Sequence, residues 1–315
     1  MEAFIEASNN NLQYFLQKPI FLDMKDKQGN TLLHYAIRGG ANDVSLYLLK
    51  NHINTNIVNN RKETAIFEAI RKGNFNIAVK IINNFGNINL KNIKGETPLH
   101  IAALKGKLEI IKLLLENKAN ILEETTEKKS ILFYAIKSGN LNIFKYLFKL
   151  SPMITKTDHN KNTLLHIAAK LGNIKIVKHL LAINENPHLK NNLDETPLYI
   201  AVKEGFTDLV GVLVKAGSYL EIKNKYNETL FDLISVIDYS NLKETLMFYL
   251  ESSLNSKNIK KHPLRHAVVT KNYEKLEKLL NNGTKDFKDE YNLTAFDYAK
   301  EQRDIKSLNI FSISK

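Results

Sequence analysis

Hydrophobic residues in this chain form short helical clusters separated by polar turns, and the same arrangement returns along the whole sequence. One apolar stretch runs from Leu99 to Ala103, and a second carries Ile110, Leu113 and Leu114. The spacing within each stretch is that of one face of a helix, not the strict alternation of a strand. Polar residues lie between the stretches. The pattern therefore predicts pairs of short amphipathic helices joined by turns.

The first stretch has clear start and stop signals. Thr97 is a good N-cap, because its hydroxyl can accept a hydrogen bond from an amide of the first turn. Pro98 suits the first helical position, where its missing N–H costs nothing. Leu99 and Ala102 are three residues apart and share a face. Gly106 suits the left-handed conformation that ends many helices. We therefore expect a short helix over roughly 98–104.

This unit repeats with a fixed period. The capping position holds Thr31, Thr64, Thr97, Ser130, Thr163, Thr196 and Thr229, each 33 residues after the one before. The closing glycines are Gly40, Gly73, Gly106, Gly139, Gly172 and Gly205. The period and the Thr-Pro-Leu-His-x-Ala pattern at 97–102 resemble the ankyrin repeat. The resemblance implies an all-α repeat solenoid of ankyrin-type helix-turn-helix units with short β-turn hairpins.

The repeats divide the chain into four predicted parts. Residues 1–25 are an N-terminal partial capping repeat, 26–231 the regular array, 232–301 divergent repeats, and 302–315 a C-terminal cap and tail. The hairpin at 125–129 has no Gly at its tip, so we expect it to be less well specified. Ile234 and Asp238 replace the usual Ala and Gly, which predicts a local irregularity within 232–260.

Composition narrows the classes of function. The 315 residues include no cysteine, which excludes disulfides and thiolate metal sites. The first residues show no secretory signal peptide, and no long apolar run is present. We therefore expect a cytoplasmic monomer without a membrane span. The formal net charge of +12 favours an acidic partner, although simple solubility would explain it equally well.

Candidate chemistry is sparse. His34, His100 and His166 share one repeat position, but they lie two repeats apart, too far to bind one metal ion. The resemblance implies that each bonds to the Thr hydroxyl and nearby backbone. His262 and His266 have a metal-binding spacing without a third ligand. No catalytic motif is present. We expect no catalytic residues, no metal site and no cofactor, and the chain is interpreted as not an enzyme.

The resemblance implies that partners contact the hairpin tips and the ends of the first helices, on the concave surface. The position two residues before each glycine holds Arg38, Arg71, Leu104, Lys137, Lys170 and Lys203, and the next adds Lys72, Lys105 and Leu171. We predict that this row binds an elongated acidic protein partner, with the leucines as apolar anchors. We also expect that Arg71, Lys137 and Lys170 can be replaced by Glu without unfolding. Lys257, Lys260 and Lys261 form a possible secondary basic patch.

The function predicted is non-catalytic protein–protein interaction. The alternative is an electrostatic binder of nucleic acid or anionic lipid headgroups, which steep salt dependence would reveal. A third option is an unrecognised enzymatic site in 232–315. The Lys, Asn and Ile richness suggests an AT-rich genome. A stand-alone ankyrin array with that bias looks like those of host-associated intracellular bacteria, and poxviruses and protozoa also use such arrays. The likeness to the bacterial arrays suggests a host-directed effector, delivered into the host cell without a cleaved signal peptide.

Overall fold

A computed structural model describes residues 1–151, 156–218, 220, 223–230, 232–233, 242, 245–246, 263–269, 272–288, 294–301 and 304–313. These residues form two compact units, Met1–Ile167 and Ala168–Lys315. Each unit is described by itself. The predicted irregularity at Ile234 and Asp238 lies outside the described residues.

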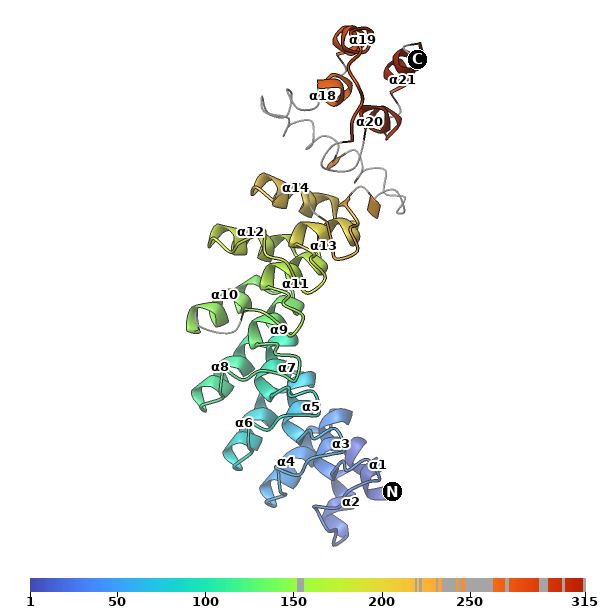
Figure 1. Cartoon of the computed structure of the whole chain (residues 1–315). Helices are drawn as coiled ribbons and strands as arrows, with labels where there is room; N and C mark the ends of the chain where they lie inside the picture. The colour runs from blue at the N-terminus through green and yellow to red at the C-terminus, as the bar shows by residue number, and fades with distance from the viewer. Residues whose placement is uncertain are drawn as a thin grey trace. The chain divides into compact units, whose positions relative to one another are not determined.

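The first unit is built from pairs of short antiparallel helices (Figure 1). The first helices of the pairs are α1 (Glu2–Ser8), α3 (Leu32–Gly39), α5 (Ala65–Lys72), α7 (Pro98–Leu104), α9 (Ile131–Lys137) and α11 (Leu164–Lys170), which extends into the second unit. The second helices are α2 (Leu12–Gln17), α4 (Asn42–Lys50), α6 (Phe75–Asn83), α8 (Leu108–Glu116) and α10 (Leu141–Leu150).

The helices of the first unit pack in two layers. Consecutive first helices contact one another, as in α3 with α5 and α5 with α7, and second helices form the other layer. The repeated alanines lie where the layers meet, and Ala36, Ala69, Ala102 and Ala135 are all fully buried. A small side chain at this point lets neighbouring helices approach closely, so the alanine period predicts the stacking. The buried aliphatic side chains of the second helices complete the core.

The second unit continues the paired plan. Its helices are α12 (Ile174–Ala182), α13 (Pro197–Lys203), α14 (Thr207–Lys215), α18 (Pro263–Val269), α19 (Tyr273–Asn281), α20 (Ala295–Glu301) and α21 (Ile305–Ile313). Helix α18 packs against both α19 and α20, and α20 packs against α21. Helices therefore return in register after residue 262, as the spacing predicts. The four predicted domain boundaries stay a prediction.

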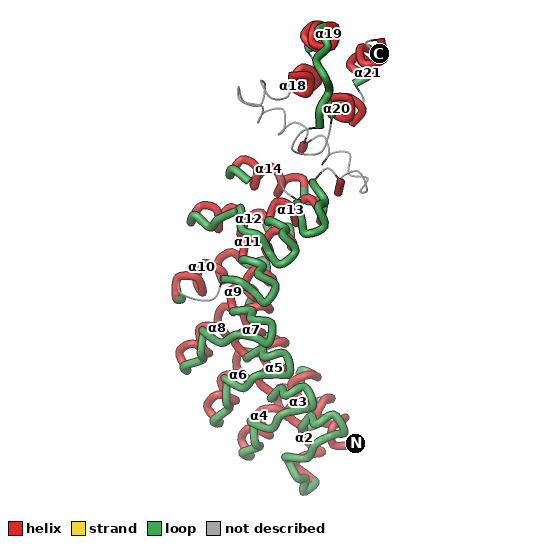
Figure 2. Tube along the Cα trace, viewed as in Figure 1, coloured by secondary structure: helices red, strands yellow, loops and turns green. Residues whose placement is uncertain are grey.

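Hairpin turns connect the repeats and stack beside the first helices (Figure 2). Each turn is organised by one side chain, here called the turn anchor: Asp26, Asn59, Asn92, Thr125, Asp158, Asn191 and Asn224. In Asn59, for example, Oδ1 accepts the backbone N–H of Arg61 at 2.9 Å and that of Glu63 at 3.1 Å. Successive turns are joined by backbone hydrogen bonds, such as Asn60 N–H to the Gln28 carbonyl at 2.8 Å.

The expectation that the hairpin at 125–129 is less well specified is wrong. Lys128 takes the left-handed conformation that Gly29 and Gly95 adopt in other repeats, with a φ of 55°. The same turn bond is present, because Lys128 N–H donates to the Thr125 carbonyl at 3.0 Å. The stack bond also forms, from Thr126 N–H to the Lys94 carbonyl at 3.1 Å. Lys62 and Lys161 take the same conformation at this position of two other repeats, so the turn forms without glycine although lysine tolerates this conformation less well.

Helices α3, α7 and α11 begin with a buried Thr–His pair, which confirms the role that the resemblance implies for these histidines. Nδ1 of His34 accepts the Thr31 N–H at 3.1 Å and lies 2.8 Å from the Thr31 hydroxyl oxygen, and Nε2 lies 3.1 Å from the Glu63 carbonyl. His100 and His166 make the same contacts with their threonines. Phe67 replaces the histidine opposite Thr64. The buried Thr64 hydroxyl consequently has no hydrogen-bond partner within the described part of the chain.

The Thr64 hydroxyl gives a first prediction. Thr64→Val keeps the β-branched shape while removing a buried unpaired polar group, so we expect the free energy of unfolding to rise by about 1 kcal/mol. Thr97→Val removes a hydroxyl that contacts His100, and we expect a fall of about 1–2 kcal/mol. Urea unfolding followed by circular dichroism measures both. Equal destabilisation by the two substitutions would contradict this account of the cap.

A second prediction concerns pH. Burial lowers the pKa of His100 from its ordinary 6.5 to about 4. Between these two pH values the unfolded chain binds more protons than the folded chain. The free energy of unfolding therefore has its full value above pH 6.5 and falls as the pH drops toward 4. The loss from His100 alone is about 2 kcal/mol at pH 5.

His100→Phe tests this effect, since phenylalanine already occupies the same repeat position at 67 and 133. The variant is expected to lose less free energy of unfolding than the natural chain between pH 7 and pH 5. The two proteins are compared by their change in free energy of unfolding between pH 7 and pH 5. Their absolute stabilities are not compared, because the substitution also removes the Thr97 contact at every pH. An identical pH dependence in both proteins would show that His100 is not the titrating group.

Candidate functional site

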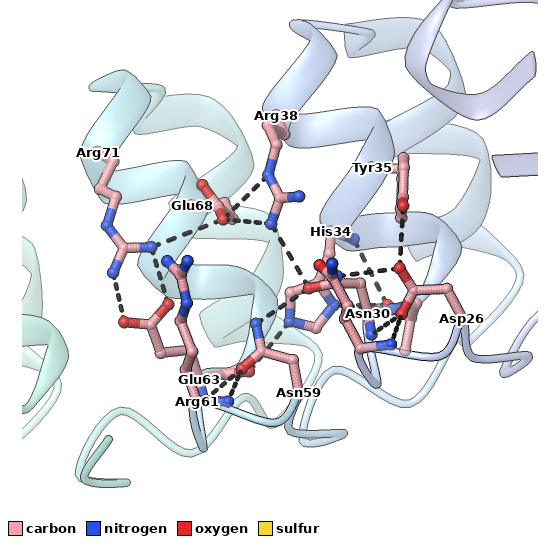
Figure 3. Close-up of polar contacts among 12 residues, drawn as sticks. Asp26, Asn30, His34, Tyr35, Arg38, Asn59, Arg61, Glu63, Glu68 and Arg71 are labelled. Atoms are coloured by element: carbon pink, nitrogen blue, oxygen red, sulfur yellow. Dashed lines mark hydrogen bonds and ion pairs between the residues drawn. The ribbon is translucent and has the colours of Figure 1, made fainter. Parts of the chain in front are cut away.

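A polar pocket of about 550 Å³ opens in the first unit between two hairpins and the helices α3 and α5. We call it the arginine pocket. It is lined by Gln28, Asn30, Arg38, Asn59, Asn60, Arg61, Glu68 and Arg71. Every lining residue is polar or charged. The pocket lies on the hairpin face, the surface made by the hairpins and the first helices, and Figure 3 shows its side chains.

Arg38 forms one wall of the pocket. It projects from the last turn of α3, and its Nε and Nη2 both donate to Oε1 of Glu68, at 3.2 and 2.7 Å. Nη2 also lies 3.5 Å from Oδ1 of Asn30. The guanidinium carbon stands 5.7 Å from the centre of the Tyr35 ring. Arg38 is thereby held in one orientation although two fifths of its side chain remain exposed (42%).

Arg71 forms the opposite wall and is tied more firmly. Its two Nη groups bind the two carboxylate oxygens of Glu63, and Nη1 lies 3.6 Å from Oε1 of Glu68. Burial by itself would raise the pKa of Glu63, but hydrogen bonds from Arg71 and its charge hold that pKa below the ordinary value. The pKa of Arg71 is raised: its bonds to Glu63 outweigh the opposing effect of burial. The bidentate pair is the strongest kind of charged contact.

This pair changes one expectation. We now expect Arg71→Glu to destabilise the fold, because it would place a third carboxylate beside Glu63 and Glu68. Glu63 has only 5% of its side chain exposed. Removing one partner of such a buried pair costs about 3–5 kcal/mol. Arg71 therefore belongs to the framework of the pocket.

The other predicted residues of the first unit lie at the C-terminal ends of their first helices. Lys72 and Lys105 are exposed at the ends of α5 and α7, and Leu104 is half-buried beside Lys105. Nζ of Lys137 stands 5.5 Å above the centre of the Tyr134 ring. Burial lowers the pKa of Lys137, and the neighbouring Lys129 charge adds to this.

In the second unit, Lys170 is exposed at the end of α11 and Leu171 has 47% of its surface exposed. Lys203 donates to Oε1 of Glu195 at 2.9 Å. Three of the predicted cations, Arg38, Arg71 and Lys203, are thus paired with acidic side chains that are themselves largely buried. Lys257, Lys260 and Lys261 lie outside the described residues.

Sequence reasoning missed the acidic partners and the amides of the pocket. The repeat pattern contains a feature that could have revealed the acidic partners. The residue just before the capping threonine is Glu63 in one repeat and Glu195 in another, each eight residues before its cation. Eight residues is two helical turns plus the cap, which brings the two side chains together. The turn anchors also recur with the repeat period, from Asp26 to Asn224.

In the parts of the chain that the structure describes, no group of three potential His, Asp or Glu ligands is close enough to hold a metal ion. Among the described helices, none has the length and apolar character needed to cross a bilayer.

Comparison with known proteins agrees with this architecture. A family model described as "Ankyrin repeats (3 copies)" matches residues 1–92, 78–158 and 150–225. No curated protein matches the chain significantly. Among solved structures, the human ASB11 ankyrin repeat domain is similar, with a TM-score of 0.60 and 24% sequence identity, over 69% of this chain and 96% of that one. This likeness concerns the fold alone. Because the family model covers well over half of the sequence, the chain belongs to the ankyrin repeat family.

Proposed function

We propose that this protein is a non-catalytic recognition scaffold that binds an acidic protein partner through its hairpin face. Ankyrin repeats imply protein–protein interaction. The observation that supports the acidic partner is the arginine pocket, where Arg38, Arg61 and Arg71 converge on one hollow surface. Arginine is favoured at protein interfaces because its planar fork binds carboxylates in a fixed geometry.

The pairing within the face favours a protein over a polyanion. A chain that binds nucleic acid or lipid headgroups electrostatically gains affinity from each cation that neutralises a phosphate. Here Arg38, Arg71 and Lys203 are already compensated by Glu68, Glu63 and Glu195. A face with fixed charges of both signs selects a complementary pattern of charge instead of a uniform one.

Charge neutralisation tests this function. The exposed lysines of the face, Lys72, Lys105, Lys137 and Lys170, are replaced together by Gln. A matched control replaces Lys50, Lys80, Lys145 and Lys178, which are exposed on the second helices. Both variants have the same net charge. We expect the natural chain and the control to retain a folded acidic protein in affinity capture from host-cell lysate, and the face variant to lose it.

The capture experiment also distinguishes binding of a protein partner from the alternative, which is electrostatic binding of nucleic acid or lipid headgroups. The affinity of the purified partner is then measured by calorimetry, and we expect at least a tenfold loss for the face variant. Equal loss in the two variants would mean that only net charge matters. Recovery of nucleic acid or lipid alone, removed by nuclease or moderate salt, would replace the proposal with electrostatic polyanion binding.

The proposal extends to a role as a host-directed effector. The richness of the chain in Lys and Ile supports this role. The richness in Asn is left out of this support, because many asparagines form the hydrogen bonds of the hairpin turns. The test is a fusion to a reporter enzyme that is active only in host cytosol, expressed in an intracellular bacterium. We expect a signal in infected cells that disappears in a secretion-deficient strain. A signal of equal size in both strains would contradict delivery.

A further inference from the structure

In the arginine pocket, some guanidinium N–H groups have an acceptor among the described residues and others have none. Arg71 uses both Nη groups on Glu63, and Arg38 uses Nε and Nη2 on Glu68. Within the described residues, neither Nη1 of Arg38 nor the guanidinium of Arg61 has a hydrogen-bond or ion-pair partner. Both residues line the same cavity. In Figure 3 the Arg61 side chain extends from its hairpin toward the first helices.

The charge balance limits the ligand. Three guanidinium groups face the carboxylates of Glu63 and Glu68, so one positive charge is left uncompensated. One carboxylate matches this charge. A phosphoryl group, with a charge of about −1.5 to −2, would leave the pocket with a net negative charge. The polar lining also argues against an apolar ligand, since typical small-molecule pockets are lined mainly by hydrophobic side chains.

The rim of the pocket suits an extended chain. Gln28 and Asn60 are exposed at neighbouring hairpins, whose backbones are joined by the bond from Asn60 N–H to the Gln28 carbonyl. The Gln28 side-chain NH₂ and the Asn60 Oδ1 have no partner in the described part of the structure. One is a donor and the other an acceptor, which are the groups that pair with the C=O and N–H of a peptide backbone.

We propose that the arginine pocket binds an aspartate or glutamate side chain presented by an extended segment of a protein partner. The carboxylate is held between Arg61 and Nη1 of Arg38, and Gln28 and Asn60 bind the flanking backbone. Glu63 and Glu68 hold Arg71 and Arg38 in place before the partner arrives, which lowers the entropic cost of binding. This inference rests on the proposed function and assigns its anchoring point within the first unit.

The test uses the full chain and a library of unstructured peptides displayed on phage. We expect selected peptides to share one Asp or Glu position. For the tightest peptide, replacing that residue by Asn or Gln is expected to weaken binding about tenfold. Arg61→Gln is expected to do the same, and the two changes together to be no worse than either alone, which is the signature of a direct contact.

Lys62→Gln is the matched control. It removes the same charge one residue away, and Lys62 is exposed and does not line the pocket. We expect its effect on affinity to be less than twofold. The Arg61 side chain has no ion pair within the described residues, so unchanged thermal unfolding of Arg61→Gln confirms that the variant is folded.

Several outcomes would overturn the inference. These are a selection without a shared acidic position, additive effects of the paired substitutions, or equal losses for Arg61→Gln and Lys62→Gln. Tighter binding of inorganic phosphate than of the peptide would assign the pocket to phosphoryl groups, and acetate binding as tightly as the peptide would exclude recognition of a segment. If peptides or protein partners still depend on Lys137 and Lys170 while Arg61→Gln has no effect, the pocket assignment fails and the proposed function stands.

Discussion

The hydrogen bonds that each turn-anchor side chain accepts from backbone amides of its own hairpin are the constraint on which the rest of the structure depends. In Asp26, Asn59 and Asn92 one side-chain oxygen accepts two backbone amides, two and four residues ahead. These bonds shape each hairpin, and in the Asp26 hairpin an antiparallel bridge between Lys25 and Thr31 flanks them. A fixed hairpin places the next capping threonine, and so the start of each first helix. It also presents Gln28, Asn60 and Arg61 beside Arg38 and Arg71, which creates the pocket.

The sequence predicts the fold in detail because the determinants are local and repeated. The capping threonine, the buried alanine and the closing glycine each act within one or two helical turns, so a fixed period carries them through every copy. Where a local rule is broken, the neighbouring copies enforce the geometry. Lys128 adopts the left-handed conformation of Gly29 and Gly95, and its hairpin keeps both the turn bond to Thr125 and the stack bond to Lys94. The sequence of a single repeat does not predict this contribution of the neighbouring repeats.

The site was less predictable because it depends on contacts between repeats. The period predicts Arg38 and Arg71 in one row and both line the pocket, but the period could not show that Glu63 and Glu68 hold them there. Arg38 belongs to one repeat and Glu68 to the next, 30 residues away. Whether a cation is free for a partner is decided by such cross-repeat pairs. The same limit applies to asparagine, which composition alone attributes to genome bias and the structure places in turns and caps.

Internal carboxylates change what a basic face can recognise. If Arg38 and Arg71 were unpaired, the face would attract any polyanion and would lose specificity as salt screened it. Pairing with the buried Glu63 and Glu68 removes most of that long-range attraction but fixes the direction of each guanidinium. Recognition then depends on whether a partner places its carboxylate near Arg61 and the remaining donor of Arg38. The stack supplies rigid, evenly spaced positions, and the pairing pattern decides which of them are available to a partner.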